Sequence, residues 1–420
     1  MREFYIYTGQ AGREVLKWFV RCYLTNFWPT ATLNECKRLC SVDQEDPDLE
    51  RIKPLGFEKQ GDIRKTENVK RLLRAYNLDP SASGSGAGKI WPTGQRLAKS
   101  KFPDFEEQSR VEISTSDCFH ISHSGGGGIG CGSGPVLSGG LQAINQRLPQ
   151  NRRASITASV FLPDVDGEPE IAVPNTCSAI GFHSGSCDGI FLFDISHAHR
   201  WMEHNGPLLP PENYREEYWV VDYAAAEIQL MLASLNERVL LKADKNFEGS
   251  DLKAFCRGVL GTSCSLVIPC YAEYPTSVLD DLDMKVIVKD LLTRRALTEY
   301  SQDRPIQRLA LFCIFPARYS TEIIGKQENQ RSLIKEVMPN VSDPWPFFHY
   351  YSREVYDRIK MLGLIVNPHI PRLLEMRDKF RSTYEEWNKG DRINTENLLM
   401  YKNGYELYSS FLRNVYGKTK

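Results

Sequence analysis

The N-terminal part of the chain combines short apolar runs with glycine-containing turns and helical periodicity. Residues 4–7 (FYIY) read as a buried strand, and residues 9–12 turn into an amphipathic helix. The apolar side of this helix consists of Val15, Leu16, Phe19 and Val20. A strand-like run at 118–122 leads into the glycine-rich stretch 124–134 and a further helix, and another strand follows at 155–161. Strand, glycine turn and helix in that order predict an α/β domain.

The second half begins with a helix of a different character. Residues 216–236 are hydrophobic nearly all round, which predicts a helix buried between two domains. Strand patterns follow at 265–269 and 308–315, and helical patterns at 370–388 and 396–415. We therefore predict an α/β fold: a Rossmann-like N-terminal domain with a mainly parallel sheet, a long central core helix, and an α+β C-terminal domain with terminal helices.

The bulk composition excludes several classes of protein. The 420 residues carry 52 Lys plus Arg against 53 Asp plus Glu, so a net charge of −1 gives no general electrostatic case for nucleic acid or an anionic membrane. The chain opens with charged residues and has no run of ~20 apolar residues. We expect no signal peptide, no membrane insertion, no direct nucleic-acid partner, and a cytoplasmic location.

The cysteines fit a reducing compartment better than a disulfide framework. The chain has eleven, only Cys36 and Cys40 lie close together, and no CxxC pair occurs. Scattered buried thiols are the expected arrangement. The three histidines at 197, 199 and 204 lack the spacing of a metal site, so we interpret them as solvated or packed side chains.

The glycine-rich stretch has the composition of an anion site. A strand that runs through glycines into a helix directs backbone N–H groups and the positive end of the helix dipole at a phosphate. Pro135 suits the first turn of the helix that follows. The absence of GK[ST] excludes a Walker P-loop, and so dense a glycine run beyond residue 120 fits the dinucleotide fingerprint poorly. A flexible glycine linker, or an ordinary α/β dehydrogenase or transferase with a nicotinamide cofactor, remains an alternative.

Three motifs in this order resemble the tubulin/FtsZ superfamily. Residues 119–124 with 126–132 resemble the tubulin phosphate loop GGGTGSG and its preceding strand, and Pro135-Val136 is more similar to FtsZ. The opening MRE…GQAG resembles the first tubulin loop, and residues 85–94 (SGAGKIWPTG) resemble its SGAGNNW loop. The missing acidic tail suggests a compact prokaryotic-type or divergent member.

The resemblance implies a cytoskeletal GTPase that binds GTP or GDP with Mg²⁺ and polymerises head to tail with itself or a related tubulin-like subunit. Hydrolysis would be completed at the interface between subunits. The corresponding division is a GTPase domain at 1–212, the central helix and connection at 213–243, an activation domain at 244–368, and terminal helices at 369–420. The implied nucleotide-binding residues are Gly9, Gln10, Ala11, Gly12, Gly86, Ala87, Gly88, Lys89, Gly126, Gly127, Gly128, Ile129, Gly130, Cys131, Gly132 and Tyr214. The implied magnesium-side residues are Gln10 and Asp79, and the implied trans-acting carboxylates are Asp251 and Glu248.

Several positions depart from the family pattern. Ile129 and Cys131 replace hydroxyl residues of the phosphate loop, and Ala254 stands where a second carboxylate is usual. Further departures are Asn77 at a magnesium-side aspartate, Gly249 at the usual Asn, and Ile195 and Tyr218 at guanine-reading asparagines. These departures support an alternative function, a degenerate tubulin-like protein that binds nucleotide without hydrolysis and regulates another filament. Asp79 also suits an Asp-Pro turn, Asp251 a helix N-terminus, and Tyr214 core packing.

Overall fold

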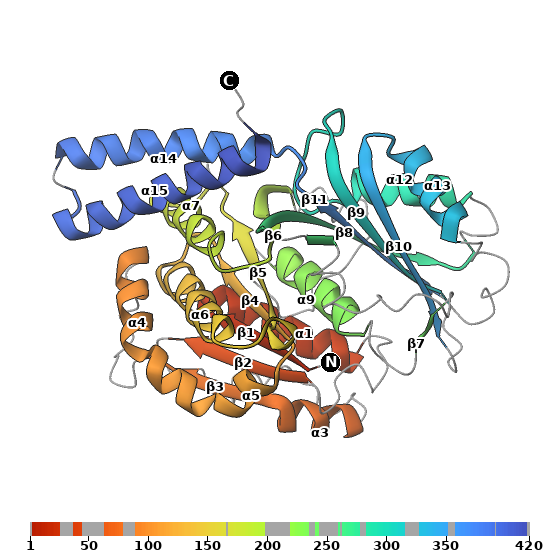
Figure 1. Cartoon of the computed structure of the whole chain (residues 1–420), viewed down its shortest axis with the longest axis horizontal. Coiled ribbons are helices and arrows are strands. Elements are labelled where there is room, and N and C mark those ends of the chain that lie inside the picture. The colour runs from red at the N-terminus through yellow and green to blue at the C-terminus, as the bar shows by residue number, and fades with distance from the viewer. Residues whose placement is uncertain are drawn as a thin grey trace.

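The computed structural model describes most of the chain as one α/β structure (Figure 1). The described residues are 2–25, 37–43, 63–78, 89–164, 167–197, 219–234, 240–242, 259–260, 263–277, 283–315, 327–351, 358–390 and 392–417. Within these residues the strands form an eleven-stranded sheet of order β3-β2-β1-β4-β5-β6-β8-β11-β9-β10-β7.

The N-terminal half of the sheet is parallel throughout. Its strands are β1 (Glu3–Thr8), β2 (Lys37–Asp43), β3 (Leu73–Asn77), β4 (Cys118–Ser124), β5 (Ser155–Leu162) and β6 (Gly189–Asp194). From β1 the chain first builds outward through β2 and β3, and then returns to the other side of β1 with β4. The strand order therefore reverses between β1 and β4, which is the position where open α/β sheets bind ligands.

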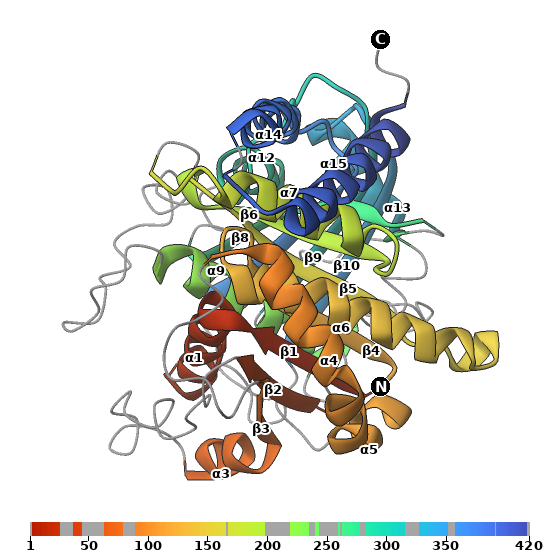
Figure 2. The ribbon, with the colours of Figure 1, turned by 90° about the vertical axis from the view of Figure 1, so that its left-hand side faces the viewer.

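The two faces of this half are covered by different helices (Figure 2). Alternate residues of β1 divide between them: Tyr5 and Tyr7 pack into one core cluster and Phe4 and Ile6 into the other. The first cluster includes α1 (Gly9–Thr25), α3 (Ile63–Leu72) and α9 (Trp219–Ser234). The second includes α4 (Trp91–Gln108), α5 (Arg110–Thr115), α6 (Gly128–Gln146) and α7 (Ala172–His183).

The C-terminal half continues the same sheet with mixed strand directions. Strand β6 pairs in parallel with β8 (Ser265–Pro275), which pairs antiparallel with β11 (Arg358–Val366). Beyond β11 lie β9 (Ile306–Phe315), β10 (Val341–Tyr351) and β7 (Leu240–Lys242). Helices α12 (Met284–Arg294) and α13 (Gln327–Val337) belong to this half (Figure 1).

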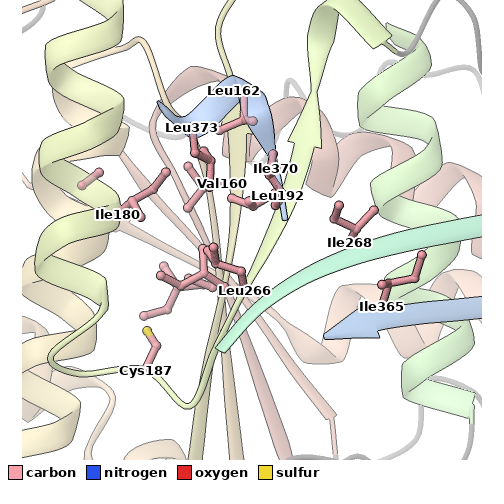
Figure 3. Packing of buried hydrophobic residues seen from close by; sticks show 14 of the residues in the cluster. Val160, Leu162, Ile180, Cys187, Leu192, Leu266, Ile268, Ile365, Ile370 and Leu373 are labelled. Carbon is pink, nitrogen blue, oxygen red and sulfur yellow. The ribbon is translucent and has the colours of Figure 1, made fainter. Parts of the chain in front are cut away.

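The terminal helices α14 (Pro371–Gly390) and α15 (Thr395–Tyr416) run side by side over α7 (Figures 1 and 2). Figure 3 shows how continuous the core beneath them is. Val160 and Leu192 of the N-terminal strands lie in one cluster with Leu266 of β8, Ile180 of α7 and Leu373 of α14. The hairpin of terminal helices is therefore part of the main hydrophobic core.

Helix α9 is held to the N-terminal half through Gln229. This side chain is buried, its Oε1 accepts a hydrogen bond from the Tyr7 hydroxyl at 2.9 Å, and its Nε2 donates to Ser122 Oγ at 2.8 Å. Tyr7 and Ser122 belong to β1 and β4, the two strands at which the strand order reverses. A polar group buried in this way needs such partners, so these bonds define where the helix sits on the sheet.

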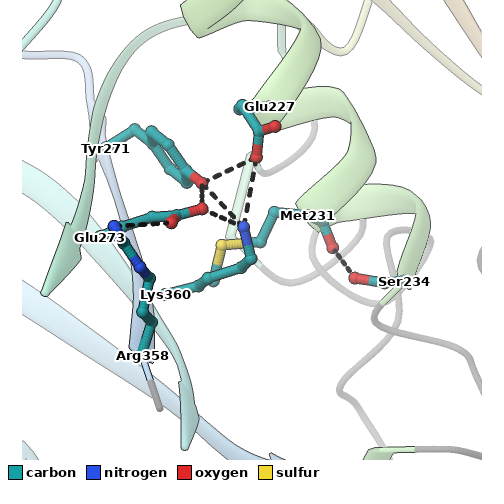
Figure 4. A network of polar contacts seen from close by, with 7 residues as sticks. All are labelled: Glu227, Met231, Ser234, Tyr271, Glu273, Arg358 and Lys360. Atoms are coloured by element: carbon teal, nitrogen blue, oxygen red, sulfur yellow. Dashed lines mark hydrogen bonds and ion pairs between the residues drawn. The ribbon is translucent and has the colours of Figure 1, made fainter. Parts of the chain in front are cut away.

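The same helix contacts the C-terminal half through Glu227, which lies roughly 200° around the helix from Gln229. Lys360 of β11 has its Nζ 3.4 Å from Glu227 Oε2 and also contacts Glu273 (Figure 4). The Tyr271 hydroxyl lies 2.9 Å from both carboxylates. Burial raises the pKa of Glu273, but the Lys360 ammonium and the hydrogen bonds outweigh it and hold that pKa below the ordinary value. The helix is thus bonded to both halves through side chains on opposite sides.

The predicted fold class is confirmed: a parallel N-terminal sheet, a buried central helix, a mixed second half and terminal helices all occur. The predicted place of Pro135 is wrong, because α6 already begins at Gly128 and Pro135 lies inside it. Residues 128–134 are helical although glycine is a poor helix former, and they pack closely against α4, since a Cβ on Gly132 would overlap the backbone nitrogen of Gln95. The predicted domain boundaries stay predictions.

The cysteine interpretation holds within the described residues, where the nine cysteines are free and all except Cys264 are buried. Burial raises the pKa of thiols such as Cys40, to about 12, so they stay protonated. None of the described helices combines the length and the apolar character that crossing a bilayer requires.

We predict that Lys360→Met lowers the free energy of unfolding by about 3–5 kcal/mol, because it removes the cation that offsets two buried carboxylates. Urea denaturation measures this loss. The matched control is Lys101→Met, in an exposed pair with Asp104 (3.7 Å, 39% and 59% exposed), where about 0–1 kcal/mol is expected. Equal losses of unfolding free energy in the two variants would contradict the conclusion that the buried network stabilises the fold more than the exposed pair does.

Candidate functional site

The candidate site lies where the carboxyl ends of β1 and β4 meet. Strand β1 ends at Thr8 and α1 begins at the next residue, Gly9. Strand β4 ends at Ser124 and α6 begins at Gly128 after a short turn. Because the two strands are parallel neighbours, both helix N-termini open at the same edge of the sheet. This edge is also where the strand order reverses, so fold and sequence motifs indicate the same place.

Glycines allow the backbones around this edge to approach each other. Gly9 has a φ of 70°, and a Cβ there would lie 2.8 Å from the backbone nitrogen of Gly130. A Cβ on Gly94 of α4 would overlap the carbonyl oxygen of Gly128. Helices α1, α4 and α6 are therefore packed at backbone distance, which no larger residue would permit at these positions.

The electrostatics of the edge favour an anion. None of α1, α4 and α6 has an acidic residue in its first turn. The N-cap residues Ile90 of α4 and Gly127 of α6 make no side-chain cap hydrogen bond. The first N–H groups of a helix have no partner within the helix, and the helix dipole adds partial positive charge there. At the start of α4 the Trp91 N–H donates to Asn175 Oδ1 and Pro92 has no N–H, so the N–H groups available at this edge belong to α1 and α6. Their side-by-side starts form an arrangement suited to phosphate groups.

Side chains of the glycine-rich segment point into the protein rather than towards this edge. Cys131 is fully buried, and its Sγ donates to the carbonyl oxygen of Ser124 at 3.1 Å and also contacts that of Gly125. Burial raises the pKa of this thiol well above its ordinary value, so it remains a donor. Ile129 is half-buried against the core. The backbone is therefore the part of this segment best placed to contact a ligand.

A buried pair of histidines supports the turn from behind. His123 Nδ1 lies 2.8 Å from the carbonyl oxygen of Ser124, which can only accept, so Nδ1 carries the proton. Burial lowers the pKa of His123 to about 4 and that of His183 well below its ordinary value, so both rings are neutral. His123 Nε2 must then accept from His183 Nε2, 2.7 Å away, and His183 Nδ1 accepts from the Ser138 hydroxyl at 3.0 Å. This relay fixes the Ser124 carbonyl.

Sequence reasoning missed this pair, although a histidine directly before a glycine loop was a usable signal. It also missed Asn175, a buried residue of α7 whose Nδ2 donates to the carbonyl oxygens of Lys89 at 2.7 Å and Gly126 at 3.0 Å. A single asparagine within an apolar helix carried no such signal. The two loops that resemble family motifs are thus joined by a residue outside all of them.

Glu168 was also not predicted. A Cβ built on Gly126 would lie 2.5 Å from its Oε2, so the carboxyl group lies directly over the loop. Burial raises the pKa of Glu168 above the ordinary value, and Lys89 opposes this shift. The raised pKa makes the protonated, uncharged form of this group more accessible beside a site that favours anions.

The structure brings many of the predicted nucleotide-binding residues together. Gly9, Gln10, Ala11 and Gly12 form the first turn of α1, and Gly126 to Gly132 form the turn before α6 and its start. Lys89 lies just before α4, and its side chain is exposed. The carbonyl oxygens of Lys89 and Gly126 both accept hydrogen bonds from Asn175 Nδ2. The predicted residues outside the described part are Gly86, Ala87, Gly88, Asp79, Tyr214, Glu248 and Asp251.

The described residues contain no group of three His, Cys, Asp or Glu side chains that would hold a metal ion. Gln10 is exposed in the first turn of α1, and Asn77 is the last residue of β3.

Comparisons of sequence and of structure give different results. No protein-family model and no curated protein sequence matches the chain. Among solved structures, CetZ from Methanosaeta thermophila matches with a TM-score of 0.61 at 14% identity, over 98% of this chain and 99% of that one. CetZ2 from Haloferax volcanii, a GTPγS-bound protofilament, matches with 0.59 at 12% identity, over 87% and 92%.

The FtsZ dimer of M. jannaschii also matches, with a TM-score of 0.56 at 14% identity, over 87% of this chain and 88% of that one. These matches cover both halves of the chain and confirm the resemblance predicted from the motifs. The chain has the fold of the tubulin/FtsZ superfamily.

Proposed function

We propose that this protein is a tubulin-like GTP- and GDP-binding cytoskeletal protein that polymerises head to tail with itself. The observation that carries the proposal is the convergence of α1, α4 and α6 at the reversal point of the sheet, without an acidic residue in any first turn. Two structures of the same fold, a GTPγS-bound protofilament of CetZ2 and a GDP-bound monomer of CetZ1 from Haloferax volcanii, support it.

The phosphates would be bound mainly by backbone N–H groups of α6 and the turn before it. Glycine at 126, 127 and 128 lets oxygen atoms approach the backbone, and Cys131 and His123 hold the turn rigid from inside. Gly9–Gly12 and Lys89 would contact the phosphates from the other side. A bound Mg²⁺ would neutralise phosphate charge, with Gln10 and Asp79 as its protein-side residues.

Hydrolysis would require a second subunit. We propose that Asp251, assisted by Glu248, reaches the γ-phosphate of the neighbouring subunit and orients the attacking water. Catalysis would then rest on positioning and on stabilisation of charge, both completed only by assembly. We further propose that assembly takes place in the cytoplasm.

One observation favours a second candidate, a non-hydrolysing protein that binds nucleotide and regulates another filament. The hydroxyl groups of the tubulin loop are replaced by Ile129, which packs against the core, and by Cys131, whose thiol points inward. Phosphate would therefore lose side-chain hydroxyl contacts in this loop. Such a protein would bind GTP without turnover and without pelleting alone.

We predict that GTP turnover per subunit rises steeply above a threshold protein concentration, together with light scattering, in the presence of Mg²⁺. An active site completed by two subunits predicts this coupling, because the nucleotide site of an isolated subunit lacks the carboxylate that the neighbouring subunit supplies. Scattering without phosphate release would indicate a filament that does not hydrolyse GTP. The absence of both light scattering and phosphate release would instead support the second candidate, a non-hydrolysing protein that regulates another filament.

We predict that Gly127→Val weakens GTP binding by at least a hundredfold while the chain stays folded. A Cβ at Gly127 meets only the flexible Ser124 side chain, whose Oγ lies 2.9 Å away, so the fold should tolerate the change while the added carbons crowd the proposed phosphate turn. Gly139→Val is the matched control on the same helix, because nothing lies within 4 Å of a Cβ there. Calorimetric titration with GTP measures both. Unchanged affinity in Gly127→Val would remove α6 from the site.

We predict that Asp251→Ala binds GTP normally but hydrolyses it at least tenfold more slowly. Mixing it with Gly127→Val, which retains Asp251 but does not bind nucleotide, should restore part of the turnover. Neither variant alone should do so, since the carboxylate and the nucleotide must come from different subunits. Normal turnover in Asp251→Ala would end the assigned role, and a mixture without recovery would contradict action between subunits.

A further inference from the structure

Asn175 makes four hydrogen bonds in the interior of the protein. Its Nδ2 donates to the carbonyl oxygens of Lys89 and Gly126, and its Oδ1 accepts from the backbone N–H of Trp91 at 3.3 Å and from the Tyr401 hydroxyl at 2.7 Å. An amide side chain offers two donors and two acceptor positions, so all four are used.

These partners also determine the orientation of the amide. If Asn175 were rotated by 180°, its oxygen would face two carbonyl oxygens and its NH₂ group would face the N–H of Trp91. Every contact with the backbone would then be repulsive. The arrangement is therefore specific for asparagine, and the isosteric carboxylate of aspartate would not reproduce it.

The backbone at Lys89, close to the start of α4, is held by this bond. Lys89 has a φ of 59°, a left-handed conformation that is unfavourable for a residue with a side chain. Its carbonyl oxygen is the closest backbone partner of the Asn175 side chain, at 2.7 Å. Because the Gly126 carbonyl is bound by the same NH₂ group, one side chain holds the backbone at Lys89 and sets its spacing from the turn before α6.

The fourth partner connects this point to the terminal helix. Tyr401 of α15 is fully buried, and its ring packs against those of Trp91 (5.8 Å between centroids) and Trp387 (5.0 Å). Helices α7 and α15 approach closely one turn further along, since a Cβ on Gly404 would lie 2.7 Å from the Cβ of Ser178. The tyrosine hydroxyl thus has little room to move away from Asn175.

We propose that Asn175 is the positioning residue that holds the two phosphate-facing loops in register, and that through Tyr401 the terminal helix α15 controls the affinity of this site for guanine nucleotide. The proposal rests on the proposed function for its ligand. Neither residue lies in a motif that resembles the family, and neither is placed to contact the ligand itself. The proposal predicts that the position of α15 and the affinity for nucleotide are coupled through a single hydroxyl group, that of Tyr401.

The experiment compares the full-length protein with Tyr401→Phe and Tyr408→Phe. Tyr408 is the matched control: it lies on the same helix, is equally buried, and donates its hydroxyl to the carbonyl oxygen of Leu373 at 2.9 Å, away from the loops. Both substitutions remove one buried hydroxyl group. We expect Tyr401→Phe to weaken GTP and GDP binding roughly threefold to tenfold, and Tyr408→Phe to change it less than about twofold.

Hydrogen exchange of residues 89–94 and 124–130 provides a second measurement that needs no nucleotide. Faster exchange is expected in both segments for Tyr401→Phe and in neither for Tyr408→Phe. Coupling is reciprocal, so GTP should slow exchange around residue 401 in the wild type and less so in Tyr401→Phe. Asn175→Asp should weaken binding more than Tyr401→Phe does, because it loses both loop contacts.

The outcomes separate this proposal from the function on which it rests. If the wild type binds no guanine nucleotide, the proposed function fails, and the exchange comparison alone decides whether α15 positions the loops. Equal exchange in the two tyrosine variants, or equal loss of nucleotide affinity in both, would overturn the coupling. A purely structural role would lower the stability of both variants without distinguishing them in either measurement.

Discussion

The close approach of helix backbones at one edge of the sheet is the constraint on which the rest of the site depends. Gly9, Gly94 and Gly132 each face a backbone atom of a neighbouring helix at a distance that leaves no space for a Cβ. This packing starts α6 at Gly128, inside the glycine run, and so brings its first N–H groups to the ends of β1 and β4. Under the proposed function, phosphate would meet backbone N–H groups and helix dipoles at this edge, because the helices lie too close together there for side chains.

The central helix α9 connects this edge of the sheet to the C-terminal half of the protein through buried polar side chains. Gln229 bonds to β1 and β4, the strands that carry the site, while Glu227 contacts Lys360 of β11 on the opposite side. Buried polar groups tolerate little displacement, because each loses its partner when the helix shifts. The position of α9 is therefore defined relative to both halves at once.

The terminal helices extend the site in a different direction. Their core contacts, with Leu373 in the main cluster, explain why they stay on α7, but apolar packing alone would not transmit a change in loop geometry. The bond from Tyr401 to Asn175 supplies the directional element, since a hydrogen bond depends on angle as well as on distance, whereas a dispersion contact depends on distance alone. The site therefore has two kinds of support: the histidine relay beneath one loop and the asparagine between two.

The sequence by itself determined the fold class and the central helix, which depend on local periodicity, and it predicted a phosphate-binding edge from glycine at fixed spacing. It did not determine where α6 begins, because glycine is a poor helix former in isolation and residues 128–134 are helical where they pack against neighbouring elements such as α4. It also did not reveal Asn175, His183 or Tyr401. The partners described above are 45 to 226 residues away along the chain, so their roles exist only after folding places those partners within hydrogen-bond distance.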